Sequence, residues 1–360
     1  MQGRQMHPVC LIGGTGRSGS TILRQMFARH PQVATLPTEA RFLTDPDGII
    51  DFGDAMRASW SPYLFDAKVK RLESLLRAVG SSPRIPRIAG KRDRARGSQV
   101  AGGSQGPAGR LGHLRRMVGD SALVRLRPRY WSVSLEDVCP SYHGLVDALV
   151  GRLVEFRFAG RWTGMPLGEA SSIHFGGPDV EGPLREFCRA VIACIAEEQE
   201  ATHFVEDTPF NLLGFDRIRD LLPESRLVHI HRDPRDVVAS YLEKRWSPSD
   251  PRLAARYYAT MMDRWHTIRE SLPEDSYIEL PLTTLVEEPQ ATLRRICEFW
   301  NLEWHPSLLE VDLSRSHTGR WRTDIPARDH AAVNEILAPY LERYVAGSPS
   351  QASPTPERSL

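Results

Sequence analysis

The sequence predicts an α/β fold with a mostly parallel central sheet flanked by helices. Short apolar runs typical of buried strands alternate with amphipathic helical patterns from Val9 to Leu280, which predicts parallel strands joined by right-handed crossovers. The first run, Val9 to Ile12, is continuously apolar, as expected for a strand buried on both faces. The 360 residues, 41% of them hydrophobic, suffice for one large domain or two modest ones.

The stretch 9–38 predicts an anion site. After the first strand comes a turn that contains four glycines, namely Gly13, Gly14, Gly16 and Gly19. From Ser20 the apolar residues follow a helical period and form one stripe, made up of Ile22, Leu23, Met26 and Phe27. Because the first N–H groups of a helix lack intrahelical acceptors and lie at its positive end, this turn could hold a phosphate.

The position of the cation distinguishes between phosphate ligands. When the turn is aligned on the GxxxxGK[ST] loop of nucleotide hydrolases, Ser20 stands where those proteins carry a lysine. The positive charge is supplied instead by Arg17, inside the loop. The alternative is an ATP-dependent kinase on a P-loop fold. The missing lysine and the lack of a clear magnesium-binding aspartate weaken this alternative.

A second strand-to-helix junction lies at residues 226–245. Arg232 follows an apolar run, Asp233 is a suitable N-cap, and Pro234 fits the first position of a helix. Ser240 then falls about two turns into that helix. An arginine fork and a serine hydroxyl at such a junction are suited to binding phosphate oxygens.

Both junctions resemble motifs of the sulfotransferases that use 3'-phosphoadenosine-5'-phosphosulfate (PAPS). The run Arg17-Ser18-Gly19-Ser20-Thr21 is similar to the family's 5'-phosphosulfate loop, and Arg232 and Ser240 have the spacing of its 3'-phosphate motif. The likeness covers about 10–45 and 203–325, and is closest to the bacterial small-molecule and tyrosylprotein branches. It implies the P-loop-like sulfotransferase fold, PAPS as co-substrate and no metal. The implied cofactor-binding residues are Gly16, Arg17, Ser18, Gly19, Ser20, Thr21, Arg232, Ser240, Arg320 and Arg322.

The resemblance also suggests two catalytic residues. Arg17 would stabilise the charge that grows on the leaving oxygen, and Glu39, in a Glu-x-Arg pattern with Arg41, would be the general base. The alternative for Glu39 is an exposed ion pair in a loop. His174 and His203 are the next candidates for the base.

Two positions depart from the family pattern. Many members carry a lysine before Thr-Pro, where this chain has Asp207, so no catalytic lysine is assigned. Some relatives place a tyrosine that touches the nucleotide where this chain has Leu282.

The expected organisation is a single sulfotransferase domain over 1–345, with cofactor-binding parts at 9–45 and 203–325. Residues 81–120 form an insertion rich in Arg and Gly, read either as a mobile cover that attracts anions or as a disordered insertion. Residues 121–200 form a variable acceptor-binding region, and 346–360 a disordered tail.

Charge and cysteine content restrict the remaining possibilities. The net charge of +1 gives no argument for nucleic acid or membrane binding, and no apolar stretch is long enough for a membrane span. Five cysteines without a CxxC pair indicate neither a disulfide framework nor a zinc site. We therefore expect a cytoplasmic protein. The resemblance implies an enzyme that sulfates a hydroxyl, with an amine as second choice, of a small-molecule or carbohydrate acceptor. A non-catalytic nucleotide-binding protein is the remaining alternative, and the oligomeric state is open.

Overall fold

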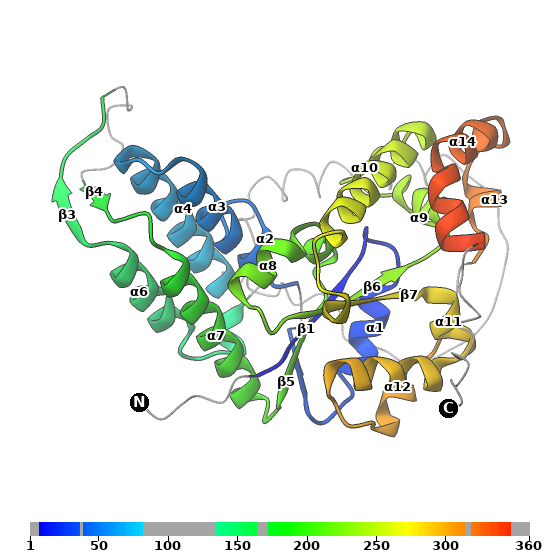
Figure 1. Cartoon of the computed structure of the whole chain (residues 1–360), viewed down its shortest axis with the longest axis horizontal. Helices are drawn as coiled ribbons and strands as arrows, with labels where there is room; N and C mark the ends of the chain where they lie inside the picture. Colours follow the sequence, from blue (N-terminus) through cyan, green and yellow to red (C-terminus); the bar gives the residue numbers. More distant parts are fainter. Residues whose placement is uncertain (1–6, 37–38, 82–133, 164–171, 314–317, 347–360) are drawn as a thin grey trace, which may run out of the picture.

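The computed structural model describes residues 7–36, 39–81, 134–163, 172–313 and 318–346 (Figure 1). Most of the insertion rich in Arg and Gly therefore lies outside the described residues, as does the tail beyond Ala346. All statements below refer to the described parts of the chain.

The predicted α/β class is confirmed by a five-stranded parallel sheet. Its strands are β1 (Val9–Gly13), β2 (Val33–Thr35), β5 (His203–Glu206), β6 (Arg226–His231) and β7 (Tyr277–Pro281). They lie in the order β2-β5-β1-β6-β7. In this register Cys10 is paired with Val205 on one side and with Arg226 on the other.

The strand order places the carboxyl end of β1 at a reversal point of the sheet. The chain runs from β1 to β2 and β5 on one side, then crosses to β6 and β7 on the other. In open α/β sheets such a point, at the carboxyl ends of the strands, is where ligands bind. The glycine-rich turn after β1 therefore lies at the expected place for a site.

Alternate residues of β1 belong to two hydrophobic cores. Cys10 and Ile12 pack with α1 (Ser20–Phe27) and α12 (Pro289–Trp300), whereas Val9 and Leu11 belong to the larger core on the other face. Helices of that second face include α7 (Glu181–Glu198), α8 (Phe215–Leu221), α10 (Pro251–Arg269) and α14 (His330–Leu341). The sheet is therefore buried on both faces, as its continuous apolar strands predict.

Three helices begin in the same way, with a side-chain cap followed by proline. Asp233 caps α9 (Pro234–Tyr241), Asp250 caps α10, and Ser61 caps α4 (Pro62–Gly80). The side chain of the cap accepts an N–H of the first turn. Proline fits the first helical position because an N–H there would have no intrahelical acceptor, so nothing is lost by its absence. The remaining helices are α2 (Arg41–Thr44), α3 (Ile49–Ser59), α6 (Tyr142–Leu153), α11 (Leu282–Glu287) and α13 (Trp321–Asp324).

The middle of the chain forms a helical layer beside the sheet, with a small hairpin at its end (Figure 1). The hairpin pairs β3 (Phe156–Ala159) with β4 (Ser172–Phe175) in antiparallel register. Asp66 of α4 is fully buried and accepts hydrogen bonds from Trp162 Nε1 and His174 N, both at 2.9 Å. This carboxylate fixes the hairpin to α4.

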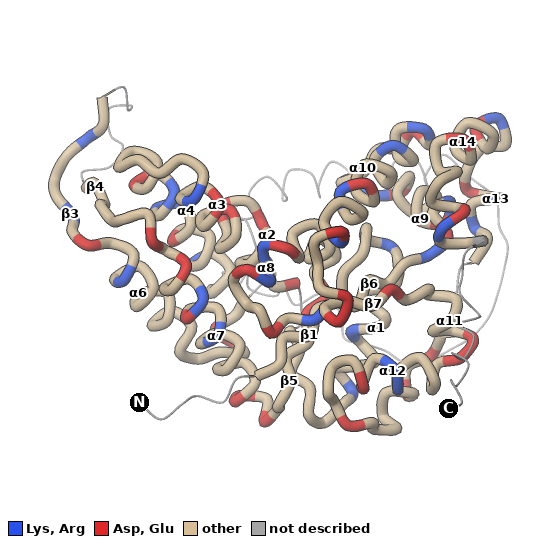
Figure 2. The backbone as a smooth tube through the Cα atoms, viewed as in Figure 1, with Lys and Arg blue, Asp and Glu red and all other residues tan. Residues whose placement is uncertain are grey.

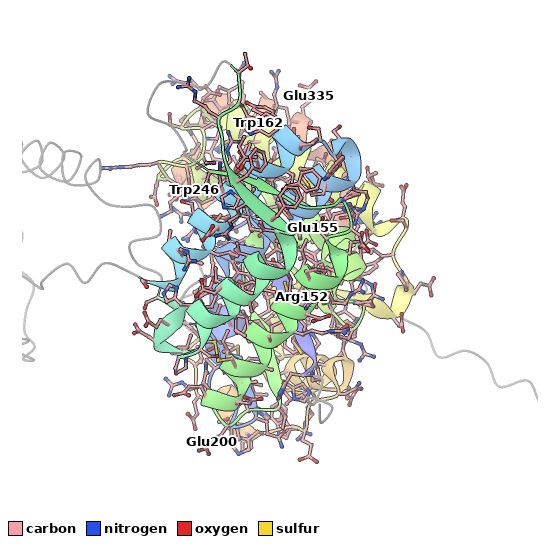
Figure 3. All side chains as sticks on the ribbon, turned by 90° about the vertical axis from the view of Figure 1, so that its left-hand side faces the viewer. Arg152, Glu155, Trp162, Glu200, Trp246 and Glu335 are labelled. Carbon is pink, nitrogen blue, oxygen red and sulfur yellow. A yellow bond between two sulfur atoms is a disulfide. The ribbon has the colours of Figure 1, made fainter. Side chains whose placement is uncertain are left out.

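The expectation that the cysteines form no disulfide is wrong. Cys139, just before α6, is bonded to Cys194 of α7, and the two Cα atoms are 5.4 Å apart (Figure 3). The two residues are 55 positions apart, and the packing of α6 on α7 brings them together. No local spacing pattern could indicate this pair, because the contact is purely tertiary.

Acidic and basic residues are interspersed over the described chain, as the near-zero net charge predicts (Figure 2). No helix within the described ranges has both the length and the apolar content that crossing a bilayer requires.

Candidate active site

The turn between β1 and α1 has an unusual backbone. Gly16, Arg17 and Gly19 all have positive φ values, of 75°, 61° and 112°. Glycine adopts this conformation freely, but for Arg17 it costs on the order of 1 to 2 kcal/mol. The strained residue is the one that supplies the cation of the loop. Such outliers concentrate at functional sites.

The loop is also tightly enclosed at Gly14. A Cβ atom at Gly14 would lie 2.3 Å from Ser18 Oγ and 2.9 Å from the carbonyl oxygen of Ile230. The Gly14 N–H donates to Pro209 O at 2.9 Å. The start of the loop is therefore held between β6 and the turn that follows β5.

The two motifs predicted from sequence touch each other. Arg17 Nε donates to Ser240 Oγ at 2.9 Å, across 223 positions of the chain. The next residue, Tyr241, donates its hydroxyl to Thr15 O at 2.5 Å. Helix α9 is thus attached to the glycine-rich loop at two neighbouring points, and the structure brings Arg17 and Ser240 together.

Polar groups of the loop lack protein partners. Ser18 is 1% exposed, and its hydroxyl finds no hydrogen-bond partner among the described residues. The N–H groups of Ser20 and Thr21, in the first turn of α1, have no intrahelical acceptor. A buried polar atom without a partner is costly, so this set of donors fits an anion.

Arg232 extends from the carboxyl end of β6 and forms an ion pair with Asp236, with Nη2 to Oδ2 at 3.2 Å. Asp236 is fully buried and also accepts the N–H groups of Gly319 at 2.8 Å and Trp321 at 3.1 Å. The predicted C-terminal segment is therefore bound directly to the second motif.

Arg320 and Arg322 lie in this C-terminal segment and contact other side chains. Arg320 Nε donates to Asp324 at 2.7 Å, and its Nη2 lies 3.3 Å from Glu243. The guanidinium of Arg322 lies over the Trp321 ring, 4.8 Å from its centre. Their assignment as nucleotide ligands stays a prediction.

Glu39 lies beyond the end of β2 and forms an ion pair with Arg41. Its side chain is about one-third exposed, at 32%. Partial burial raises the pKa of the Glu39 carboxyl, Arg41 opposes this, and Asp207 and Asp45 add to it. A carboxylate whose pKa is moved toward neutrality is a better proton acceptor than an ordinary surface glutamate.

Part of the chain matches a known protein family. Residues 177–306 match the model described as "Sulfotransferase family". This segment of the chain is similar to the sulfotransferase family. The matched segment contains Arg232 and Ser240, whereas Arg17 and Glu39 lie before it. No curated protein matches the sequence.

Solved sulfotransferase structures resemble the chain over nearly its whole length. The sulfotransferase domain of the Synechococcus PCC 7002 olefin synthase is 16% identical, with a TM-score of 0.45, 94% of this chain covered and 96% of that one. Sulfotransferase STF9 from Mycobacterium avium is 13% identical, with a TM-score of 0.44, 94% of this chain covered and 77% of that one.

Asp207 binds an arginine. Asp207 Oδ1 lies 3.1 Å from Nε of Arg24, on α1, and both side chains are largely buried. Arg24 also donates to Leu36 O at 3.3 Å. Asp207 is therefore used to hold α1 against the end of β5.

Leu282 makes an apolar contact with the glycine-rich loop. Its Cδ1 would lie 2.8 Å from a Cβ built on Gly19, so the side chain packs against the start of α1.

The histidines proposed as alternative bases lie elsewhere. His203 begins β5 and so sits at the amino-terminal end of the sheet, opposite the glycine-rich loop. His174 lies in the hairpin, with Nδ1 3.3 Å from Asp66. His30, which is not proposed as a base, lies three residues beyond α1 and is hydrogen-bonded to Glu303 O at 2.8 Å. None of the three is linked to the loop by a hydrogen bond within the described residues.

Sequence reasoning missed Glu206, the last residue of β5. It is 2% exposed and accepts hydrogen bonds from Ala40, Thr208 and Asn211. Its signal was an acidic residue that ends an otherwise apolar strand, at the carboxyl edge where sites form.

The enclosure of Gly14 leads to a prediction. Gly14→Ala should lower the free energy of unfolding by about 1 to 3 kcal/mol, because its Cβ overlaps a backbone carbonyl that cannot rotate away. Gly151→Ala, in the interior of α6 with no atom within 4 Å of the added Cβ, is the control and should stabilise by about 0.5 to 1 kcal/mol. Chemical denaturation measures both. Equal effects of the two variants would show that the loop is not tightly packed.

Proposed function

We propose that this protein transfers a sulfuryl group from PAPS to a hydroxyl, or secondarily an amine, of a small-molecule or carbohydrate acceptor and releases 3'-phosphoadenosine 5'-phosphate. The observation that carries the proposal is the hydrogen bond of Arg17 to Ser240. It joins the two anion-binding motifs at one edge of the sheet, as a ligand with phosphates at both its 5' and 3' positions requires.

The donors of the loop fit the 5' end of this co-substrate. Arg17, the unpartnered Ser18 hydroxyl and the first N–H groups of α1 would bind phosphate oxygens. Arg17 would also stabilise the negative charge that grows on the leaving oxygen as its bond to sulfur breaks. The strained backbone of Arg17, with its positive φ, would hold the guanidinium in place before the co-substrate binds.

Arg232 and Ser240 would bind the 3'-phosphate. Asp236 orients Arg232 and simultaneously binds the C-terminal segment, so this segment and the proposed phosphate ligand share one buried carboxylate. Because the buried Asp236 holds the Arg232 side chain in place before the ligand binds, less side-chain entropy is lost on binding.

Glu39 would complete the transfer. The acceptor oxygen forms a bond to sulfur, the sulfur to bisphosphate bond breaks, and the acceptor proton passes to the Glu39 carboxylate. The raised pKa of Glu39 and its position beyond the carboxyl end of β2 support this role. Arg41, its ion-pair partner, would keep the carboxylate in one orientation.

The organisation as a single catalytic unit over 1–345 belongs to the same proposal. Buried residues of α4, α6 and α7 share one continuous core with those of α10 and α14. The helical layer of the middle region is thus packed on the same core as the cofactor motifs. This supports its assignment as the acceptor-binding part of one domain.

Transfer of labelled sulfur tests the function. The protein is incubated with PAPS labelled in its sulfonate and with a panel of phenols, monosaccharides and amines. We expect label in at least one acceptor, in amounts that depend on Arg17. Binding of PAPS without transfer to any acceptor or to water would favour a non-catalytic nucleotide-binding protein.

Arg232→Ala should weaken binding of 3'-phosphoadenosine 5'-phosphate by about tenfold to a hundredfold, because a charged arginine to phosphate bond contributes about 1.5 to 3 kcal/mol. Affinity for AMP, which lacks the 3'-phosphate, should change little. Calorimetry measures both ligands. Arg264→Ala, which removes an exposed partner of Asp216, is the control. A parallel loss for AMP and the bisphosphate would show that Arg232 does not bind the 3'-phosphate.

A further inference from the structure

The turn that follows β5 contacts both parts of the candidate site. At its start, Glu206 accepts the N–H of Ala40 at 2.8 Å, and Ala40 is the residue next to Glu39. At its end, Pro209 O accepts the N–H of Gly14 at 2.9 Å. Four residues, 206–209, therefore connect the backbone beside the proposed base to the backbone that begins the phosphate loop.

Glu206 is saturated with hydrogen-bond donors. Oε1 accepts from the N–H of Ala40, from the N–H of Thr208 at 2.9 Å and from the Thr208 hydroxyl, while Oε2 accepts from Asn211 Nδ2. Every partner donates, which is the pattern for an ionised carboxylate. Burial raises the pKa of Glu206 to about 6, and the donors oppose that shift. Above this pH the carboxylate is charged and can hold all its partners.

A buried charge is expensive, and a fold retains one where it gives a specific arrangement. Among the described residues, the one backbone N–H that Glu206 binds from another element is that of Ala40. Within the same part of the chain, the Glu39 carboxylate itself is bound by Arg41, which belongs to the same local segment. The position of Glu39 relative to the glycine-rich loop thus depends on Glu206.

We propose that Glu206 is a positioning residue, which acts on the transfer reaction by fixing the Glu39 segment relative to the phosphate loop. The inference rests on the proposed function, in which Glu39 accepts the acceptor's proton. It assigns to Glu206 no contact with either substrate. A displacement of about 1 Å in a catalytic group can cost on the order of a hundredfold in rate.

A double-mutant cycle tests this role. In Glu206→Gln the side chain keeps its size but loses its charge, and its NH2 group faces either Ala40 or Asn211, so the hold on the Ala40 N–H is weakened. We expect kcat to fall by about 10- to 100-fold with the KM for PAPS within about twofold. Glu206 acts through Glu39, so it should have no further effect once Glu39 is replaced. The kcat of the double variant, Glu39→Gln with Glu206→Gln, should therefore lie within about threefold of that of Glu39→Gln alone. Losses that multiply would overturn the proposal.

Two probe acceptors of similar shape give a second readout. Phenol is un-ionised at pH 8.5 and needs a base, whereas 4-nitrophenol is largely ionised and does not. Glu206→Gln should slow transfer to phenol far more than transfer to 4-nitrophenol. An equal loss with both would show general damage to the site and would contradict the positioning role.

Hydrogen exchange gives a readout that requires no acceptor. The amide of Ala40 should exchange faster in Glu206→Gln, and in the milder Thr208→Val if the first variant fails to fold. Asp66→Asn is the matched control, since it changes another fully buried carboxylate with several donors but leaves Ala40 untouched. Unchanged exchange at Ala40 in both test variants would sink the idea.

The proposed function and the role of Glu206 can be disproved independently of each other. If the bisphosphate does not bind the unsubstituted protein, the proposed function is wrong. If the bisphosphate binds and sulfur is transferred while Glu206→Gln keeps wild-type kcat, only the role of Glu206 is wrong.

Discussion

Glu39→Gln is expected to lower turnover by about 10² to 10⁴, because the amide keeps the size and reach of the side chain but cannot accept a proton. Affinity for 3'-phosphoadenosine 5'-phosphate should stay within about twofold, since no cofactor motif is changed. Steady-state transfer to phenol and calorimetry measure the two quantities. The pH profile should also change. The pKa of Glu39 lies above its ordinary value, so turnover in the unsubstituted enzyme falls as the pH drops through that raised pKa and the base becomes protonated.

Glu335→Gln is the control for Glu39→Gln. Glu335 is an exposed carboxylate of α14, outside the proposed cofactor-binding and acceptor-binding parts (Figure 3). Its replacement should leave turnover unchanged. A Glu39→Gln enzyme within about threefold of the unsubstituted one would remove Glu39 from the mechanism. Neither His174 nor His203 would then be an easy replacement, because one is bound to Asp66 and the other starts β5 at the far end of the sheet.

Arg17→Ala should lower kcat by about 10² to 10³, and it should raise the KM for PAPS by a smaller factor. The reason is that charge on the leaving oxygen develops only during transfer, so the guanidinium stabilises the transition state more than the bound substrate. The substitution also removes the donor to Ser240. Steady-state kinetics with varied PAPS separate the two parameters.

Arg17→Lys distinguishes charge from geometry. Lysine keeps the positive charge but has no Nε–H fork with which to bind Ser240 and phosphate together. Turnover should therefore lie between that of Ala and that of Arg. Arg29→Ala, which removes an exposed arginine just after α1, should leave both parameters unchanged. A loss in Arg17→Ala confined to KM would make Arg17 a ground-state anchor only.

The strand-to-helix junctions of the candidate site could be predicted from sequence because their signals are local. Gly14 to Thr21 and Arg232 to Ser240 each combine a strand, a turn and a helix within a short stretch, and caps such as Asp233 lie where their residue types predict. The contact of Arg17 with Ser240 could be anticipated only by family resemblance, since no local rule joins positions 223 residues apart.

The parts that escaped prediction are buried polar contacts between distant segments. Glu206 with Ala40, Asp66 with the hairpin, and Cys139 with Cys194 all depend on how elements pack, and their residue types fit a surface equally well. The hairpin was missed for a different reason. Apolar and polar residues do alternate in Phe156-Arg157-Phe158 and in Ser172-Ile173-His174-Phe175, but each strand has only four residues, the lower limit at which alternation identifies a strand.

Ligand preference in the unsubstituted protein tests the central claim most directly, because it requires no knowledge of the acceptor. Calorimetry compares 3'-phosphoadenosine 5'-phosphate with AMP, ADP and ATP, each with and without Mg²⁺. The account predicts that the bisphosphate binds at least about tenfold more tightly than AMP, since Arg232 and Ser240 would contact only its 3'-phosphate. It also predicts that Mg²⁺ makes no difference to that binding. Equal affinity for AMP and the bisphosphate, or tight binding of ATP that depends on Mg²⁺, would contradict the account.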